Sequence, residues 1–224
     1  MILAEDEHRI YLLKAAGVPV FPPHADPDGD CVYARVCAAR PERAAGWPAG
    51  FEGGIAHRLD NPTSGLLVAA RTPADLDVLR GEFASHVLRK FYLFRSSAVV
   101  AFRDVVRTDP IAHHPNRKDR MVPQRHPKIP HRGRWYDAWT RFTARGDGWW
   151  QAEIRTGVTH QIRVHALAAG IPLDNDPIYR PQTPEDPLPA DAPRLTLHHA
   201  CIVAPGWRSP VAPLSGGPDV VVRP

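Results

Sequence analysis

A continuous apolar run followed by a helical pattern is the feature that most constrains how this chain can fold. Residues 65–70 read Gly-Leu-Leu-Val-Ala-Ala, a run typical of a buried strand. Thr72 can then cap a helix, and Pro73 suits its first position. Apolar side chains recur at helical spacing downstream, at Leu76, Leu79, Phe83 and Val87. A buried strand that leads directly into an amphipathic helix predicts mixed α and β structure.

The other predicted elements are mostly strands. Residues 145–148, Arg-Gly-Asp-Gly, indicate a hairpin between strands expected over 136–143 and 149–155. A second helix is expected over 160–169, with Gly170 as its stop. Further strands are expected over 9–13, 90–100, 195–204 and 220–223.

Three stretches predict irregular backbone. The polar, basic stretch 104–133 indicates a long loop or an irregular hairpin, and the proline-rich stretches 19–27 and 172–193 indicate loops. The order of elements lacks strict βαβ alternation, so it favours an α+β fold with a mixed, mainly antiparallel sheet flanked by helices and loops. No break in composition indicates a second domain, and we expect a single domain over residues 1–224.

The composition excludes several classes of protein. Of the 224 residues, 43% are hydrophobic, which is enough for a packed core. No run of apolar residues is long enough for a membrane span, and residues 1–9 lack the apolar core of a signal peptide. We therefore expect a cytoplasmic protein. The 3 cysteines have no C-x-x-C spacing and predict reduced, partly buried thiols.

Motifs of several common enzyme classes are absent from the sequence. The 12 histidines include no H-E-x-x-H pattern, so no metal site is expected, and a metal hydrolase is only a third alternative. There is also no G-x-S-x-G elbow, no P-loop and no G-x-G-x-x-G.

The positive charge is concentrated in one segment. The chain carries a net charge of +4, yet residues 103–145 hold eleven Lys and Arg against four Asp, a net of +7. A localised positive field suits a polyanion such as RNA. A solvated, Arg-rich surface explains the same pattern, and charge alone does not separate the two interpretations.

Residues 54–68 place a polar loop before the apolar strand. In this loop a cation, Arg58, and a carboxylate, Asp60, are two residues apart. Loops held by a rigid strand are where functional side chains concentrate, and an aspartate there can act as nucleophile or general base. The alternative is an aspartate that caps a turn and pairs with Arg58.

Two further stretches carry candidate functional residues. Residues 157–165 read Gly-Val-Thr-His-Gln-Ile-Arg-Val-His, in which Thr159 is the expected N-cap, and a helix N-terminus favours anions such as phosphate. The alternative is an ordinary amphipathic helix with an exposed Arg163. On the strand over 90–100, alternation places Lys90 and Tyr92 on one face, where Tyr92 is either a stacking platform for a base or an edge residue.

Taken together, these stretches resemble the RluA-type pseudouridine synthases. The pattern H-R-L-D-x-x-T-S-G-L-L of that family is matched at every fixed position by residues 57–67, and its K-x-Y by Lys90 and Tyr92. Its G-R-T-H-Q-I-R-V-H is matched by residues 157–165, except that Val158 replaces the first arginine. Weaker matches extend the ordered set over about residues 5–205: Lys14-Ala15-Ala16-Gly17 for K-P-A-G, Ala138 and Thr140 for A-x-T, and residues 197–200 for L-H-A.

The resemblance implies an isomerase that converts uridine in structured rRNA or tRNA to pseudouridine, in a central cleft and without metal or cofactor. Asp60 would be the catalytic nucleophile, Arg163 would pair with it, and Tyr92 would stack on the uracil. Arg58 would fill the space that the flipped uridine leaves. The remaining residues implied to hold substrate or site are His57, Thr63, Lys90, Thr159, His160 and Gln161.

Two departures from the family pattern matter for function. Val158 removes a positive charge beside the expected site, although Asp60, Tyr92 and Arg163 are retained. The sequence also predicts no S4 RNA-binding domain before the catalytic domain, so RNA binding is expected from the catalytic domain and its basic segment, in a monomer. The alternative function is a catalytically silent RNA-binding or chaperone protein with the same fold.

Overall fold

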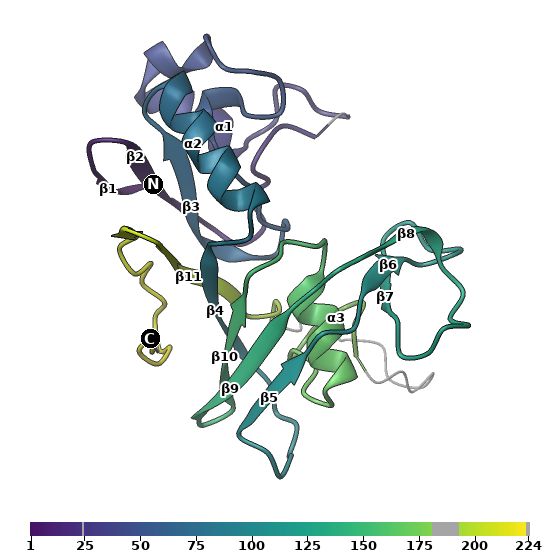
Figure 1. The fold of residues 1–224 in the computed structure, drawn as a ribbon. Coiled ribbons are helices and arrows are strands. Elements are labelled where there is room, and N and C mark those ends of the chain that lie inside the picture. The colour runs from purple at the N-terminus through teal and green to yellow at the C-terminus, as the bar shows by residue number, and fades with distance from the viewer. Residues whose placement is uncertain (24, 181–192, 223–224) are drawn as a thin grey trace. The chain divides into compact units, whose positions relative to one another are not determined.

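A computed structural model describes residues 1–23, 25–180 and 193–222 (Figure 1). The chain forms two compact units. Unit 1 comprises Met1–Leu88 and His198–Ser215, and unit 2 comprises Arg89–Leu197 and Gly216–Pro224. Both units combine helices with mainly antiparallel strands, which confirms the expected α+β class. The single domain over residues 1–224 and its central cleft stay predictions.

The sheet of unit 1 is built around the apolar run. Its strands are β1 (Ile2–Glu5), β2 (Arg9–Lys14), β3 (Ser64–Ala70), β11 (Leu197–Ala204) and β12 (Trp207–Arg208). The strands β1 and β3 pair with β2 in antiparallel fashion, whereas β11 runs parallel to β3 with His199 opposite Gly65. Every residue of β3 after Ser64 is buried, as the continuous apolar run predicts.

Three short elements and one longer helix complete unit 1. The short elements are α1 (Val32–Ala39), η1 (Pro41–Ala44) and η2 (Glu52–Gly54), none of which the sequence pattern predicts. In α2 (Pro73–Ala84) Thr72 and Asp75 form a reciprocal capping box, which confirms the expected start. The helix ends before the expected Val87, because His86 has a positive φ of 58° that breaks the helical path and leaves Val87 exposed.

The main sheet of unit 2 is an antiparallel ladder. Its order is β4 (Arg89–Arg95), β10 (Trp149–Ile154), β9 (Thr140–Gly146) and β5 (Asp104–Arg107), and these strands lie side by side in Figure 1. The predicted hairpin is confirmed: Asp147 and Gly148 both have positive φ, as a two-residue turn between paired strands requires. The strand expected over 90–100 ends at Arg95, because that residue pairs with Trp149, the first residue of β10.

The stretch 104–133 is more ordered than expected. Besides β5, it contains β6 (Ile111–His113) and β7 (Met121–Pro123), and it runs into β8 (Arg132–Tyr136). The last three strands form a small antiparallel sheet in the order β7-β6-β8, so the expectation of a long loop was wrong and only the irregular hairpin of β6 and β7 is confirmed. The buried Ile111 and Met121 pack with Val164 and Tyr179, and these long-range contacts do not appear in a local pattern.

The boundaries of the remaining strands differ from the predicted ones, and hydrogen bonds at these positions explain the differences. The strand expected over 136–143 is split between β8 and β9, because the backbone N–H of Trp139 donates to the Thr156 hydroxyl instead of a neighbouring strand. No strand forms over 220–222, where the side chain of Gln151 bonds to both the N–H and the carbonyl of Val221. Position 223 and most of the expected 172–193 loop lie outside the described residues. The second helix is α3 (Gln161–Ala168), and Gly170 follows its C-cap with φ 78° as expected.

The described part of the chain shows neither a membrane-spanning helix nor a cluster of metal-binding side chains. Within the described ranges, no helix is long and apolar enough to cross a membrane. In the same part of the chain, no group of three or more His, Cys, Asp or Glu side chains could hold a metal ion. The cysteines are free thiols, with Cys31 and Cys201 buried.

Candidate active site

The loop that carries Asp60 is tied at its start to strand β3. The backbone N–H of Ala56 donates to the Val68 carbonyl (2.9 Å), and the Val68 N–H donates to Nε2 of His57 (3.1 Å). The His57 ring lies 4.9 Å from the Phe83 ring and meets the His199 ring edge-on at 5.6 Å between centroids. His57, expected to contact substrate, is therefore also part of the structural support of the loop.

A tight turn follows Asp60. The Thr63 N–H donates to the Asp60 carbonyl (3.0 Å), and the Thr63 side chain is buried. The next carbonyl, that of Asn61, accepts from the Gly17 N–H (2.8 Å) and from Nζ of Lys14 (3.0 Å). The backbone from Asp60 to Thr63 is thus held by hydrogen bonds, whereas Asp60 itself is half-buried and Arg58 is exposed.

Lys14 is an unexpected component of this support. Its side chain is 1% exposed, and its Nζ also donates to the Ala15 carbonyl (3.1 Å). Burial lowers the pKa of Lys14 to about 8, and the negative charge of Asp60 acts in the opposite direction. A buried cation next to the turn therefore feels the charge of the proposed catalytic carboxylate.

A second set of contacts holds the loop where β3 begins. The hydroxyl of Ser64 bonds to Nδ1 of His198 (2.9 Å), whose Nε2 faces the Ala212 carbonyl (3.2 Å). A carbonyl only accepts, so Nε2 carries the proton and Nδ1 accepts from Ser64. Burial lowers the pKa of His198, which favours this neutral form.

In unit 2, the start of α3 differs from the prediction. Its N-cap is His160, in the left-handed region with φ 57°, and Thr159 is exposed and outside the helix, so the expected Thr159 N-cap was wrong. The start of α3 has no side-chain cap; Gln161, its first residue, instead binds the segment before the helix, because its Oε1 accepts from the Val158 N–H (3.1 Å) and the Thr156 hydroxyl (2.9 Å). Its Nε2 donates to the Trp139 carbonyl and the Thr140 hydroxyl, so this 3% exposed amide is fully used in the fold.

Arg163 is buried, so the interpretation as an exposed arginine was wrong. Its Nε and Nη2 donate to the two oxygens of Asp176, each at 2.7 Å, and the side chains are 2% and 0% exposed. Burial alone would raise the pKa of Asp176, but the hydrogen bonds and charge of Arg163 outweigh it and hold that pKa below its usual value. The pairing of Arg163 with Asp60 stays a prediction.

Lys90 and Tyr92 both lie on β4, and their spacing of two residues places them on one face of the strand, as expected. They pair with Ile154 and Ala152 of β10, and their side chains are 6% and 7% exposed. Burial lowers the pKa of Lys90 to about 8. Its Nζ lies 3.6 Å from the position that a Cβ on Gly157 would occupy, so the lysine reaches the segment that leads into α3.

Residues 8–168 match the family described as RNA pseudouridylate synthase. The chain belongs to this family. The match covers most of the sequence and spans the Asp60 loop, the K-x-Y strand and the start of α3. It therefore confirms the family suggested by the ordered motifs.

Curated proteins that are similar to this family member are named as pseudouridine synthases. The chain is 37% identical over 202 residues to ribosomal large subunit pseudouridine synthase D of Nitrosomonas europaea, covering 88% of this chain and 55% of the relative. It is 31% identical over 189 residues to the protein of that name in Escherichia coli, covering 82% and 54%. An uncharacterized RNA pseudouridine synthase of Chloroflexus aurantiacus is 34% identical over 220 residues, covering 94% and 64%. The chain thus spans about half to two thirds of the length of these relatives.

Two human structures share the fold of this family member. The RNA pseudouridylate synthase domain containing 1 protein superposes with a TM-score of 0.72, over 95% of this chain and 82% of that one. The domain containing 4 protein gives 0.70, over 95% and 87%. Both are 18% identical in sequence, so the likeness concerns the fold.

The basic segment of the family member is partly neutralised. Arg107, Arg117 and Arg141 pair with Asp109, Asp119 and Asp104 respectively. Other cations of the segment, among them Lys118, Arg125 and Lys128, are exposed. The segment therefore presents a surface with excess positive charge.

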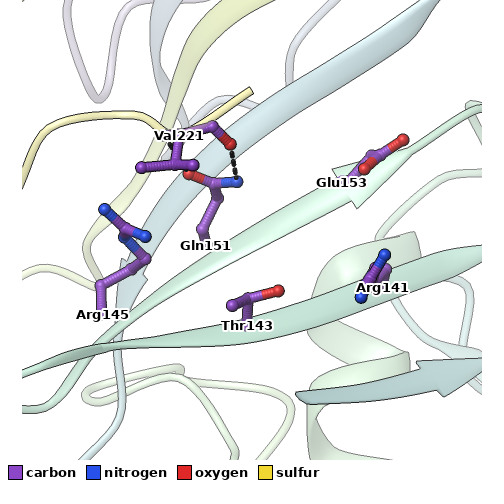
Figure 2. A pocket seen from close by; sticks show the side chains of 6 residues that line it. All are labelled: Arg141, Thr143, Arg145, Gln151, Glu153 and Val221. Atoms are coloured by element: carbon purple, nitrogen blue, oxygen red, sulfur yellow. Dashed lines mark hydrogen bonds between the residues drawn. The ribbon is translucent and has the colours of Figure 1, made fainter. Parts of the chain in front are cut away.

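Two hollows lie in unit 2. One, of about 10 Å³, is formed by side chains of β9 and β10, where Gln151 binds Val221 and Arg145 and Thr143 lie alongside (Figure 2). It is no larger than a water site. The other, of about 400 Å³, is lined by apolar side chains that include Val164, Leu167 and Ile178, and also by Arg120, Arg125 and Arg180.

Proposed function

We propose that this chain is an RNA pseudouridine synthase that isomerises specific uridines in structured RNA. The observation that carries the proposal is the family match over residues 8–168, within which every fixed position of the 57–67 pattern is retained. The hydrogen-bonded turn at Asp60 supports it, because a nucleophile must be held in one position to react efficiently.

In the proposed mechanism Asp60 is the nucleophile. The uracil is detached at its N-glycosidic bond, rotated, and rejoined to the sugar through C5. The C5 proton is lost and N1 gains one, so the reaction needs no net redox change and the proposal includes no metal or cofactor. We assign to Arg163 the pairing with Asp60, to Tyr92 the stacking on the uracil, and to Arg58 the filling of the vacated stack.

The proposed substrate is large-subunit ribosomal RNA, with transfer RNA as the second structured RNA to test. The names of the relatives from Nitrosomonas europaea and Escherichia coli favour ribosomal RNA. The net +7 of residues 103–145 is suited to the phosphate backbone. A protein of this function works where ribosomes are assembled, so we propose a cytoplasmic location. We also propose that it acts as a monomer.

The decisive experiment is pseudouridine mapping on transcribed RNA. Purified protein is incubated with large-subunit rRNA fragments and tRNA, and pseudouridine is mapped chemically at each uridine. We expect at least one uridine to be converted by the wild type and none by Asp60→Asn. Asp77→Asn, an exposed aspartate of α2, is the matched control and should retain activity.

Two outcomes would contradict this assignment. Conversion by Asp60→Asn at the wild-type rate would remove Asp60 from the chemistry. Tight, salt-sensitive binding of every RNA without any conversion would instead favour the catalytically silent RNA-binding protein.

A further inference from the structure

The buried partner of Arg163 is a residue that the family motifs do not include. Asp176 lies thirteen residues after Arg163, in the stretch that the sequence predicts only as a proline-rich loop. Its two oxygens take the Nε and Nη2 donors of Arg163 in a two-point pair. Such a fork-to-carboxylate pair fixes both the position and the plane of a guanidinium.

Asp176 is itself held in place by the backbone. Its Oδ1 accepts from the N–H groups of Ile178 (2.8 Å) and Tyr179 (2.9 Å), in addition to the Arg163 donor. The carboxylate is thus bonded to its own local turn as well as to the arginine. Asp176 therefore has backbone partners of its own besides Arg163, and these help to fix its position.

A ring holds the face of the same guanidinium. The Cζ of Arg163 lies 4.9 Å from the centroid of the Tyr179 ring. The Tyr179 hydroxyl accepts from the Met121 N–H (2.7 Å) and bonds to Nδ1 of His160 (2.8 Å). Arg163 is therefore constrained at its edge by Asp176 and at its face by Tyr179, and both constraints come from one turn.

We propose that Asp176 is a positioning residue that fixes the orientation of Arg163 for the isomerisation, an inference that rests on the proposed function. Asp176 acts through Arg163 and does not touch RNA. A buried arginine without a partner lacks a counter-charge and hydrogen-bond acceptors. The Asp176 carboxylate supplies the negative charge and two acceptor oxygens in the plane of the guanidinium. Asparagine has one acceptor oxygen, and its NH₂ would face a guanidinium N–H, so it cannot hold the same orientation.

The test compares Asp176→Asn, Asp176→Glu and the matched control Asp30→Asn. Asp30 also forms a two-point pair, with Arg35, but that pair is on the surface of unit 1. For each variant, the single-turnover rate of conversion and the Kd for the same RNA are measured, and folding is checked by thermal unfolding. We expect Asp176→Asn to lower the rate by about 100-fold, as for a group displaced by about 1 Å, with a Kd within about 2-fold of the wild type, because the phosphate contacts that dominate RNA affinity remain.

A double-mutant cycle separates positioning from general structural damage. In an Arg163→Lys background, the fork is already absent, so Asp176→Asn should lower the rate by less than about 3-fold more. Damage that acts independently of Arg163 would multiply in the double variant. Asp176→Glu keeps the charge and both oxygens and should recover part of the rate lost by Asp176→Asn.

Each result decides for or against the inference. A folded Asp176→Asn with the wild-type rate, or rate losses that multiply in the cycle, would overturn it. Should Asp176→Asn fail to fold, Asp176→Glu decides: a lower rate at unchanged Kd supports the role, and an unchanged rate overturns it. An inactive wild type on every RNA is a different result, because it overturns the proposed function and the inference with it.

Discussion

Gly65 faces the backbone of His199 so closely that no larger residue fits between β3 and β11. A Cβ at position 65 would overlap the His199 carbonyl oxygen and would lie 2.6 Å from its nitrogen. The φ of Gly65 is +111°, in a region that L side chains rarely adopt. The parallel pairing of His199 with Gly65 therefore depends on this glycine, directly after the Asp60 loop.

Gly65→Ala should destabilise the protein strongly. The backbone strain and the overlap together should lower the free energy of unfolding by about 3 kcal/mol or more. Urea unfolding monitored by fluorescence measures the change. Gly46→Ala is the matched control, because Gly46 also has a positive φ but has open space around it.

The control should lose only about 1 kcal/mol, which is the strain of the left-handed backbone alone. Equal losses in the two variants would mean that the close approach of His199 adds nothing.

Gln161→Leu should lower the free energy of unfolding by about 3 kcal/mol. Leucine leaves the Trp139 carbonyl and the Val158 N–H without their partner, and unmet buried polar groups are costly. Thr159→Ala, which would cost about 1 kcal/mol if Thr159 were the N-cap, should change stability by less than about 0.5 kcal/mol. Urea unfolding of both variants checks this, and a larger loss for Thr159→Ala would restore the capping role.

Stability should decrease as the pH falls below about 6.5. Burial lowers the folded-state pKa of His198 and His165, so the folded protein binds fewer protons than the unfolded chain in the range below the ordinary value of 6.5. The contribution of these two histidines to the free energy of unfolding is complete above that pH, and it is lost as the pH falls towards their lowered pKa. Urea unfolding at pH 8, 7, 6 and 5.5 measures the dependence.

His198→Asn should flatten this dependence, since the variant lacks one of the two titrating groups. His131→Asn, at an exposed position, is the matched control and should keep the wild-type slope. An identical slope in all three proteins would show that His198 does not contribute.

Replacing Arg117, Lys118 and Arg125 together by alanine should weaken RNA binding and its salt dependence. All three are exposed, whereas Arg120 donates to the Ile178 carbonyl and belongs to the fold. The slope of log Kobs against log salt should become shallower by about 0.7 to 0.9 for each phosphate contact removed. Filter binding at several salt concentrations measures the slope.

The matched control is a triple alanine variant at exposed arginines of unit 1, at Arg35, Arg71 and Arg80. It removes the same charge outside the basic segment. If it reduces the slope as much as the first variant, net charge rather than the basic segment determines RNA affinity.

Local sequence determined the elements whose signals lie within a few residues of one another. The capped start of α2, the Asp147-Gly148 turn and the buried strand β3 follow from capping, positive φ and an apolar run, which act over one or two turns of chain. The ordered motifs indicated the family, and with it the candidate residues Asp60, Tyr92 and Arg163.

The tertiary structure decided which residues support that site. Lys14 reaches the turn after Asp60 from 47 positions away, and Asp176 meets Arg163 from the stretch that the sequence predicts only as a proline-rich loop. His160 adopts a left-handed backbone at the start of α3, where its Nδ1 bonds to the Tyr179 hydroxyl from 19 positions away. The local sequence pattern thus determined where some of the helices, strands and turns lie. Which charged and hydrogen-bonding side chains pair with one another was decided by the tertiary structure, because partners far apart in the sequence are brought together only by packing.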